Sequence, residues 1–215
     1  MRNDERLRTI YEVMAPYIVR NEHNWRDYLA FASQFHKHSF DNILLVYAQD
    51  EDVSILATRK QWAAIGRNLI PRAKGVAVCV YRNAKLTLDY LFDVSQTTGK
   101  EIHPTDWQLS DEMKEALTER LSYAHGFPKQ GFSQALYAMA SESVADNYNH
   151  FLQELKQETK GHLFTEIPAG GFEAQYIQLL TDSISYFIGK KCHLPDEEIQ
   201  LSDGMATVSH FNTLP

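Results

Sequence analysis

The stretch GVAVCVYRNAKLTLDYLFDV, residues 75–94, decides the fold class, because it holds two β-type runs with little chain between them. Branched and aromatic residues dominate both runs, which is typical of strands that pack on one face. The intervening Arg82-Asn83-Ala84 is turn-like. The pattern predicts an antiparallel pair of strands over about 75–82 and 86–94.

Upstream of these strands, apolar residues recur at helical spacing. Residues 4–19 are amphipathic, a second helix is predicted from Asn24 and a third from Asp41, so that residues 36–42 form the turn between two helices. We expect the helices from 24 and 41 to pack on the sheet. Residues 53–66 predict a short β-rich run and then a short helix that ends at Gly66.

Downstream, residues 95–107 are polar with Gly and Pro and predict a loop. Three helical patterns follow, over about 110–125, 132–157 with a possible break near Asn147, and 172–191. The predicted fold class is α+β, with N-terminal helices on a small antiparallel sheet followed by a mainly helical region. The predicted domains are residues 1–104 and 105–215.

Charge is distributed unevenly along the 215 residues, whose net charge is −7. Residues 1–100 hold 14 basic and 11 acidic side chains, and residues 101–215 hold 7 and 17. This step indicates two functional regions, or simply an acidic second half without a specific role. No apolar run is long enough for a membrane span, the N-terminus lacks a leader pattern, and two isolated cysteines fit a reducing compartment. A cytoplasmic protein without membrane contact is therefore predicted.

Familiar catalytic and cofactor motifs are absent from the sequence. It lacks GxGxxG, GxxxxGK[ST], HExxH, CxxC and GxSxG. His36 and His38 are close together but have no third ligand nearby, so that no metal and no cofactor are predicted.

The first half instead combines aromatic rings with cations, as single-strand nucleic-acid binders do. Five cations lie within sixteen residues: Arg59, Lys60, Arg67, Arg72 and Lys74. Trp25 and Trp62 are candidate stacking platforms, but both lie on apolar helical faces, where a tryptophan more often belongs to the core.

The order of several motifs resembles the N-terminal single-stranded-DNA-binding domain of ArdC-type antirestriction proteins and of related LtrC-like proteins of conjugative elements. The match covers about residues 7–97. It rests on these steps: Trp25-x-x-Tyr28-Leu29-x-Phe31, Ser39-x-x-Asn42, Gln49, Trp62-x-x-x-Gly66-Arg67, Lys74-Gly75-Val76 and Phe92-Asp93-x-Ser95-Gln96-Thr97. The resemblance implies binding of single-stranded DNA (ssDNA) that shields incoming plasmid or transposon DNA.

Residue types and resemblance together give a set of predicted DNA contacts. The set is Trp25, His36, Lys37, His38, Ser39, Asn42, Arg59, Trp62, Arg67, Arg72, Lys74, Tyr81 and Gln96. Ser39 and Asn42 lie at a helix start, where free backbone N–H groups favour a phosphate. They can equally cap their own backbone, and the two roles are compatible.

In ArdC-type proteins the second half resembles a metallopeptidase with an HExxH helix. Here Glu142 keeps the glutamate of that motif, Ser141 and Ala145 stand at the two histidine positions, and Asp182 resembles a third ligand. Serine and alanine cannot replace two imidazole ligands of zinc. The resemblance therefore implies a zincin-like region that has lost its metal and its catalysis, with Glu142 and Asp182 as vestigial positions.

Three functions remain open from the sequence. The first is a non-enzymatic ssDNA-binding accessory protein of a mobile element, with conjugation or restriction proteins as further partners. The second is a metal-dependent hydrolase with an atypical site built from Glu142, Asp182 and a histidine such as His150 or His162. The third is an interaction module whose acidic half docks a basic partner such as a relaxase or a restriction subunit.

Overall fold

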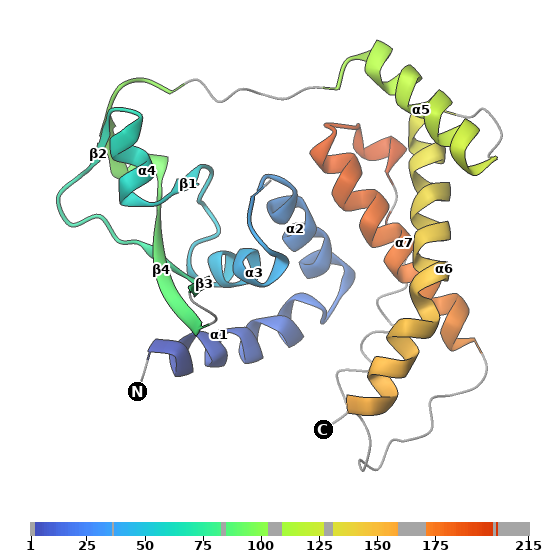
Figure 1. Cartoon of the computed structure of the whole chain (residues 1–215), viewed down its shortest axis with the longest axis horizontal. Coiled ribbons are helices and arrows are strands. Elements are labelled where there is room, and N and C mark those ends of the chain that lie inside the picture. Colours follow the sequence, from blue (N-terminus) through green and yellow to red (C-terminus); the bar gives the residue numbers. More distant parts are fainter. Residues whose placement is uncertain are drawn as a thin grey trace. The chain divides into compact units, whose positions relative to one another are not determined.

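The computed structural model describes residues 3–35, 37–82, 85–102, 109–126, 131–158, 171–199 and 201. The chain forms two compact units (Figure 1). The first unit contains Met1–Ile18 and Gln34–Asp106, and the second contains Val19–Ser33 and Trp107–Pro215. The predicted α+β class is confirmed. Within the described residues, every helix is too short or too polar to be a membrane span.

The first unit contains the strands. Its elements are α1 (Asn3–Ile18), α3 (Phe40–Gln49), β1 (Leu56–Ala57), α4 (Arg59–Ala64), β2 (Arg67–Leu69), β3 (Val76–Arg82), β4 (Lys85–Asp93), the 3-10 turn η1 (Val94–Gln96) and β5 (Thr97–Gly99). One antiparallel sheet has the order β1-β4-β3, and β2 pairs with β5 in a second. The two strands predicted from residues 75–94 are confirmed. The loop predicted from residue 95 is wrong at its start, because Thr97 pairs with Leu69 and the polar segment continues as β5.

The core of the first unit lies between one face of the β3–β4 hairpin and the apolar side of α3. Val76 pairs with Leu91 in the ladder, and both are buried together with Val78. The buried residues of α3 are Ile43, Leu44, Leu45 and Val46. As predicted, the helix from residue 41 packs on the sheet.

Two amide side chains of α3 seal the outer edge of β3. Asn42 donates to the carbonyl oxygen of Cys79 (2.7 Å) and accepts from its N–H (2.8 Å). Gln49 repeats this pattern on Ala77, at 2.9 and 3.0 Å. The two amides thus give the edge strand the hydrogen bonds that a neighbouring strand would otherwise supply.

Asp93 ties the end of β4 to the segment before β1. Its carboxylate accepts hydrogen bonds from the backbone N–H groups of Ser54 (2.7 Å), Ile55 (3.0 Å) and Ser95 (2.8 Å). Burial alone raises the pKa of this carboxyl, but the hydrogen bonds to its charged form outweigh burial and hold the pKa below its ordinary value. Asp93 is therefore a structural member of the Phe92–Thr97 motif.

The lowered pKa of Asp93 predicts acid sensitivity of the first unit. A carboxyl with a lower pKa in the folded state contributes stability above its unfolded pKa of about 3.9 and loses it as pH falls through the folded pKa. In urea unfolding, we expect the stability gap between the wild type and Asp93→Asn to be widest above about pH 4 and to narrow below it. The exposed Glu51→Gln variant is the control, and a gap for Asp93→Asn that does not change with pH contradicts the assignment.

The second unit is helical. It contains α2 (Glu22–Ser33), α5 (Asp111–His125), α6 (Phe132–Glu158), α7 (Phe172–Lys191) and the 3-10 turn η2 (Asp196–Glu198). The Ser110 side chain caps α5, Gly126 ends it with a φ of 70°, and α6 continues through Asn147 without a break.

Helix α2 corrects one prediction. It begins at Glu22 rather than after Asn24, whose N–H donates to the Asn21 side chain at 2.9 Å. It packs against α7 of the second unit rather than on the sheet, and the Trp25 indole N–H donates to the Ser183 hydroxyl at 2.9 Å. The reason is its apolar side, because Leu29 joins a core cluster with Tyr186.

Candidate nucleic-acid interface

A groove of about 690 Å³ lies in the first unit, beside α4 and the outer side of β4. Its lining residues are Thr58, Arg59, Lys60, Gln61, Ala63, Arg82, Asp89, Tyr90 and Phe92. The start of α4 is fixed by a capping box in which the Gln61 N–H donates to the Thr58 hydroxyl and the Thr58 N–H donates to the Gln61 side chain. This cap places two consecutive cations, Arg59 and Lys60, at the groove.

The groove carries more positive than negative charge. Arg82 pairs with Asp89 at 2.6 Å, and Asp89 also accepts the Tyr90 N–H at 3.0 Å. Among the described residues, no ion pair or side-chain hydrogen bond engages the exposed cationic ends of Arg59 and Lys60. Two cations in the groove thus remain available to an anionic ligand.

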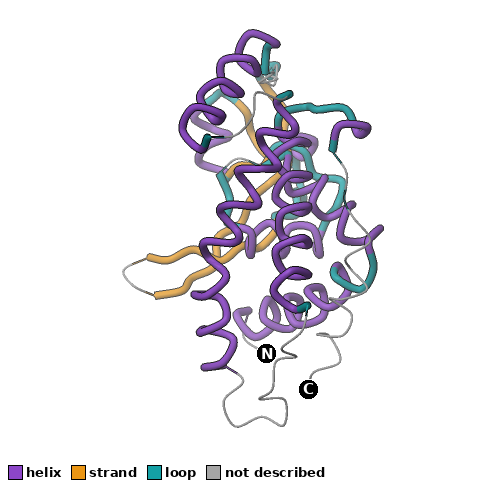
Figure 2. Tube along the Cα trace, turned by 90° about the vertical axis from the view of Figure 1, so that its right-hand side faces the viewer, coloured by secondary structure: helices purple, strands orange, loops and turns teal. Residues whose placement is uncertain are grey.

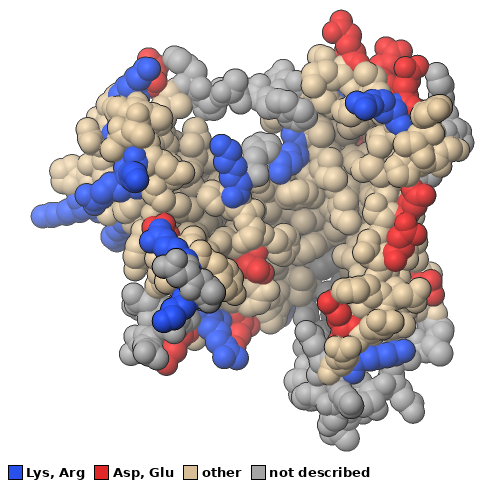
Figure 3. Space-filling view, in the orientation of Figure 1, with Lys and Arg blue, Asp and Glu red and all other residues tan. Residues whose placement is uncertain are grey.

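Charge differs between the two units as a whole. The first unit has 12 basic and 11 acidic residues, and the second has 9 and 17. In Figure 3, Lys and Arg predominate over the strands and α4, whereas Asp and Glu line α5 and α6. The first unit is close to neutral, so that an anion would be attracted by the local cations of the groove rather than by net charge.

Aromatic rings form the other wall of the groove. Tyr90 is 45% exposed and Phe92 is half-buried. They lie two residues apart on β4 and therefore on one face of it. A Cβ at Gly75 would come within 3.0 Å of the Phe92 ring and of the Tyr90 Cβ, so that glycine at this position leaves the two aromatic side chains their room.

Of the predicted contacts, Arg59 lies in the groove and four others are exposed elsewhere on the first unit. These four are Lys37, Arg72, Lys74 and Tyr81. Arg72 has a φ of 64°, and Tyr81 is 79% exposed near the end of β3. They are accessible, but they do not line the groove.

Four predicted contacts have internal structural roles. The Ser39 hydroxyl accepts the Asn42 N–H at 3.4 Å as a helix cap, and the Asn42 amide is held by Cys79. The Arg67 guanidinium donates to the Thr97 hydroxyl (2.7 Å) and carbonyl (3.0 Å) and to the Lys100 carbonyl (2.5 Å). Gln96 is half-buried, and its backbone carbonyl accepts the Ile70 N–H at 3.0 Å.

The structure corrects the prediction that two tryptophans, Trp62 and Trp25, are stacking platforms. Trp62 is only 1% exposed and donates its indole N–H to the Phe92 carbonyl at 2.8 Å, so that its ring offers no face to a base. Trp25 belongs to the second unit and packs against its core. The alternative interpretation, a core tryptophan, is thus correct for Trp62, while Trp25 is partly buried against the core of its unit; each indole lies on the apolar side of its helix.

Of the two predicted histidine contacts, the structure describes only His38. His38 is half-buried, makes an edge contact with the Phe35 ring at 6.2 Å, and has a pKa lowered by burial. Burial disfavours its charged form, so that His38 is a poorer phosphate ligand than Lys37. His36 lies outside the described residues.

The sequence reading missed Arg82, Tyr90 and Phe92 as site residues. The sequence pattern predicts a turn at Arg82 and places the two rings within a strand. The available signal was the period of two in β4, which places Leu86, Leu88, Tyr90 and Phe92 on one face. That face is opposite Leu91, which is buried in the core.

The positions of the lost peptidase motif lie on α6 and α7. Glu142 lies against His125, with 2.5 Å between its Oε2 and the imidazole Nδ1. Asp182 is buried and accepts hydrogen bonds from Gln178 at 2.9 and 3.1 Å. The described parts of the chain contain no group of three His, Cys, Asp or Glu side chains able to hold a metal. His150 lies 3.7 Å from Glu154, and His162 is outside the described residues.

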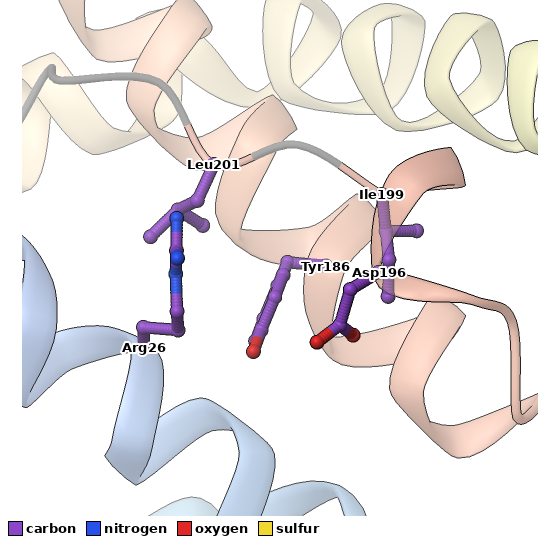
Figure 4. Close-up of a pocket in the computed structure, with 5 residues that line it drawn as sticks. All are labelled: Arg26, Tyr186, Asp196, Ile199 and Leu201. Atoms are coloured by element: carbon purple, nitrogen blue, oxygen red, sulfur yellow. The ribbon is translucent and has the colours of Figure 1, made fainter.

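A second, smaller pocket of about 200 Å³ lies in the second unit (Figure 4). It is lined by Arg26, Tyr186, Asp196, Ile199 and Leu201. Arg26 lies 6.0 Å from the centre of the Tyr186 ring and pairs with Glu22, and Lys190 pairs with Asp196. Its charges are thus balanced internally, which indicates a structural joint between α2, α7 and η2 rather than a ligand site.

The chain matches no protein-family model, no curated protein and no solved structure.

Proposed function

We propose that the first unit binds ssDNA in the groove beside α4. The observation that carries this proposal is the juxtaposition in one groove of Arg59 and Lys60, which no described residue pairs, with the aromatic side chains Tyr90 and Phe92. Cations track a phosphate backbone, while rings stack on bases, each stack contributing about 1–3 kcal/mol. A duplex hides its base faces, so that this combination favours single strands over duplex DNA.

The motif resemblance supports the same proposal and adds its biological setting. It implies a non-catalytic accessory or antirestriction-like protein of a conjugative or other mobile element, acting in the cytoplasm. The structure changes which residues are expected to make contact. Trp62, Arg67 and Asn42 hold the fold, while Arg59, Lys60 and Tyr90 reach the ligand.

Binding to labelled ssDNA across a salt series tests the proposal. Arg59→Ala with Lys60→Ala removes two phosphate contacts, and we expect the salt slope, log Kd against log salt, to fall by about 1.4. Tyr90→Ala should weaken binding by about 1–3 kcal/mol with an unchanged salt slope. Lys74→Ala is the matched control, because Lys74 is exposed outside the groove lining. Wild-type protein that fails to bind ssDNA even at low salt excludes this function.

We propose that the second unit is a degenerate, zincin-like region without catalytic activity. Two observations support this assignment. Glu142 is paired with His125, and Asp182 is held by Gln178. The excess of acidic residues in this unit favours contacts with basic proteins, such as relaxase or restriction subunits, as its remaining role.

A further inference from the structure

The two outer edges of the β3–β4 hairpin differ. Asn42 and Gln49 cover the outer edge of β3 at Cys79 and Ala77, whereas β1 covers β4 at Phe92 and Asp93. Cys79 and Ala77 direct their backbone N–H and C=O groups away from β4. In an antiparallel ladder their partners on β4, Leu88 and Tyr90, then direct their backbone groups away from β3. The backbone groups of Leu86, two residues before Leu88, also point away from β3. No described residue bonds the outward N–H and C=O groups of Leu86 and Leu88.

The open edge lies on the part of the hairpin that extends beyond the neighbouring helices (Figure 2). Its side chains there are unusually accessible: Tyr81 is 79% exposed and Leu86 is 54% exposed. A two-stranded ribbon is only marginally stable in water without a further partner. Unprotected edges of this kind pair with other strands.

We propose that this edge pairs with β4 of a second copy of the chain, antiparallel, around a twofold axis at Thr87. Leu86 of each copy then exchanges both backbone hydrogen bonds with Leu88 of the other copy. On one face of the ribbon the two leucines pack together, and on the other Lys85 faces Asp89 of the second copy. Opposite charges and apolar residues are thus matched along the same register.

The structure selects this register over its neighbours. Only shifts by two residues keep outward-facing groups opposite one another. A slide by two residues toward β1 sets Lys85 opposite Leu91 of the second copy and so separates the charged pair, and a slide by four brings Leu86 against Phe92, whose outer side is already paired with Ala57. A slide in the other direction shortens the pairing and separates Lys85 from Asp89. The Thr87 register is therefore the one that sets Lys85 opposite Asp89 and leaves β1 in place.

This inference goes beyond the proposed function and does not depend on it. It rests on the backbone of β4 and on charge matching, and it is tested without DNA. Because the outer side of β4 also borders the groove beside α4, ssDNA and a second copy would compete for it. A dimer that does not bind ssDNA would contradict only the proposed function, and a monomer that binds ssDNA would contradict only the proposed dimer.

Sedimentation equilibrium of the full chain tests the dimer. Lys85→Glu and Asp89→Lys each place like charges opposite one another, and we expect each to weaken dimerisation by about tenfold. The double variant restores the pairing with its charges exchanged and should recover the wild-type dissociation constant. Loss of the Arg82–Asp89 pair within one chain would not give this recovery. Lys74→Glu, with the same change of charge away from the edge, should dimerise like the wild type.

Amide hydrogen exchange gives a second readout at the edge itself. The Leu88 amide should become protected as protein concentration rises, whereas the Thr87 amide, which faces β3, should be protected throughout. Three results overturn the proposal: a wild type that stays monomeric, a dimer that Lys85→Glu leaves intact, and a dimer in which the Leu88 amide stays unprotected.

Discussion

Trp62→Ala should unfold the first unit rather than merely weaken DNA binding. Trp62 is among the largest fully buried side chains, and its indole N–H bonds to the Phe92 carbonyl at 2.8 Å. Truncation of a core tryptophan leaves a cavity and costs about 3–5 kcal/mol, a large part of the stability of a domain of this size. Urea unfolding followed by circular dichroism measures the loss.

Two further variants separate packing from ligand contact. Trp62→Phe keeps much of the ring and loses the hydrogen bond, so that it should cost less than Trp62→Ala. Tyr81→Ala, at an exposed position, should stay within about 0.5 kcal/mol of the wild type. Wild-type stability of Trp62→Ala together with weakened ssDNA binding would place this ring at the interface after all.

Asn42→Leu should cost about 2–3 kcal/mol although the two side chains are similar in size. Leucine leaves both backbone groups of Cys79 without the partners that Asn42 provides at 2.7 and 2.8 Å. Unpaired polar groups that are largely shielded from water cost about 1–3 kcal/mol each. The midpoint of urea unfolding should fall with little change in the slope of free energy against urea concentration.

Gln49→Leu is the matched comparison on the same helix. Its bonds to Ala77 are exposed, so that water replaces them and the loss should be smaller than for Asn42→Leu. The Cys79 amide should also exchange faster in Asn42→Leu than in Gln49→Leu. Equal stability of the two variants would contradict the role assigned to Asn42.

The hairpin and most helices were predictable from local signals. Alternation and branched residues define β3 and β4, and Ser110 and Gly126 mark the ends of α5. The partner of α2 was not predictable, because an apolar stripe shows that a helix is buried but not against which element. β5 was missed because the polar run Thr97-Thr98-Gly99 is held by a distant strand and by Arg67.

The candidate site was only partly predictable for a related reason. Composition identified cations and rings but could not show which of their polar groups the protein itself uses. Arg67 and Arg59 look alike in the sequence. Arg67 nevertheless donates its hydrogen bonds to Thr97 and Lys100, whereas Arg59 is exposed in the groove. The Asn42 amide bonds to Cys79, which is 37 positions away, so that the sequence around either residue does not predict this pairing.

The placement of α2 in the second unit determines which fragments of this protein can fold by themselves. The chain enters the second unit at Val19, leaves it after Ser33 and enters it again at Trp107. Cleavage near residue 104 would therefore leave the two fragments associated through α2 and α7. A recombinant piece ending near residue 100 would carry α2 without its partner and expose Leu29 and more of Trp25 to water, which favours aggregation. A fragment designed to test the proposed ssDNA binding of the first unit alone has to omit α2, and hence to join residues 18 and 34 by an artificial linker.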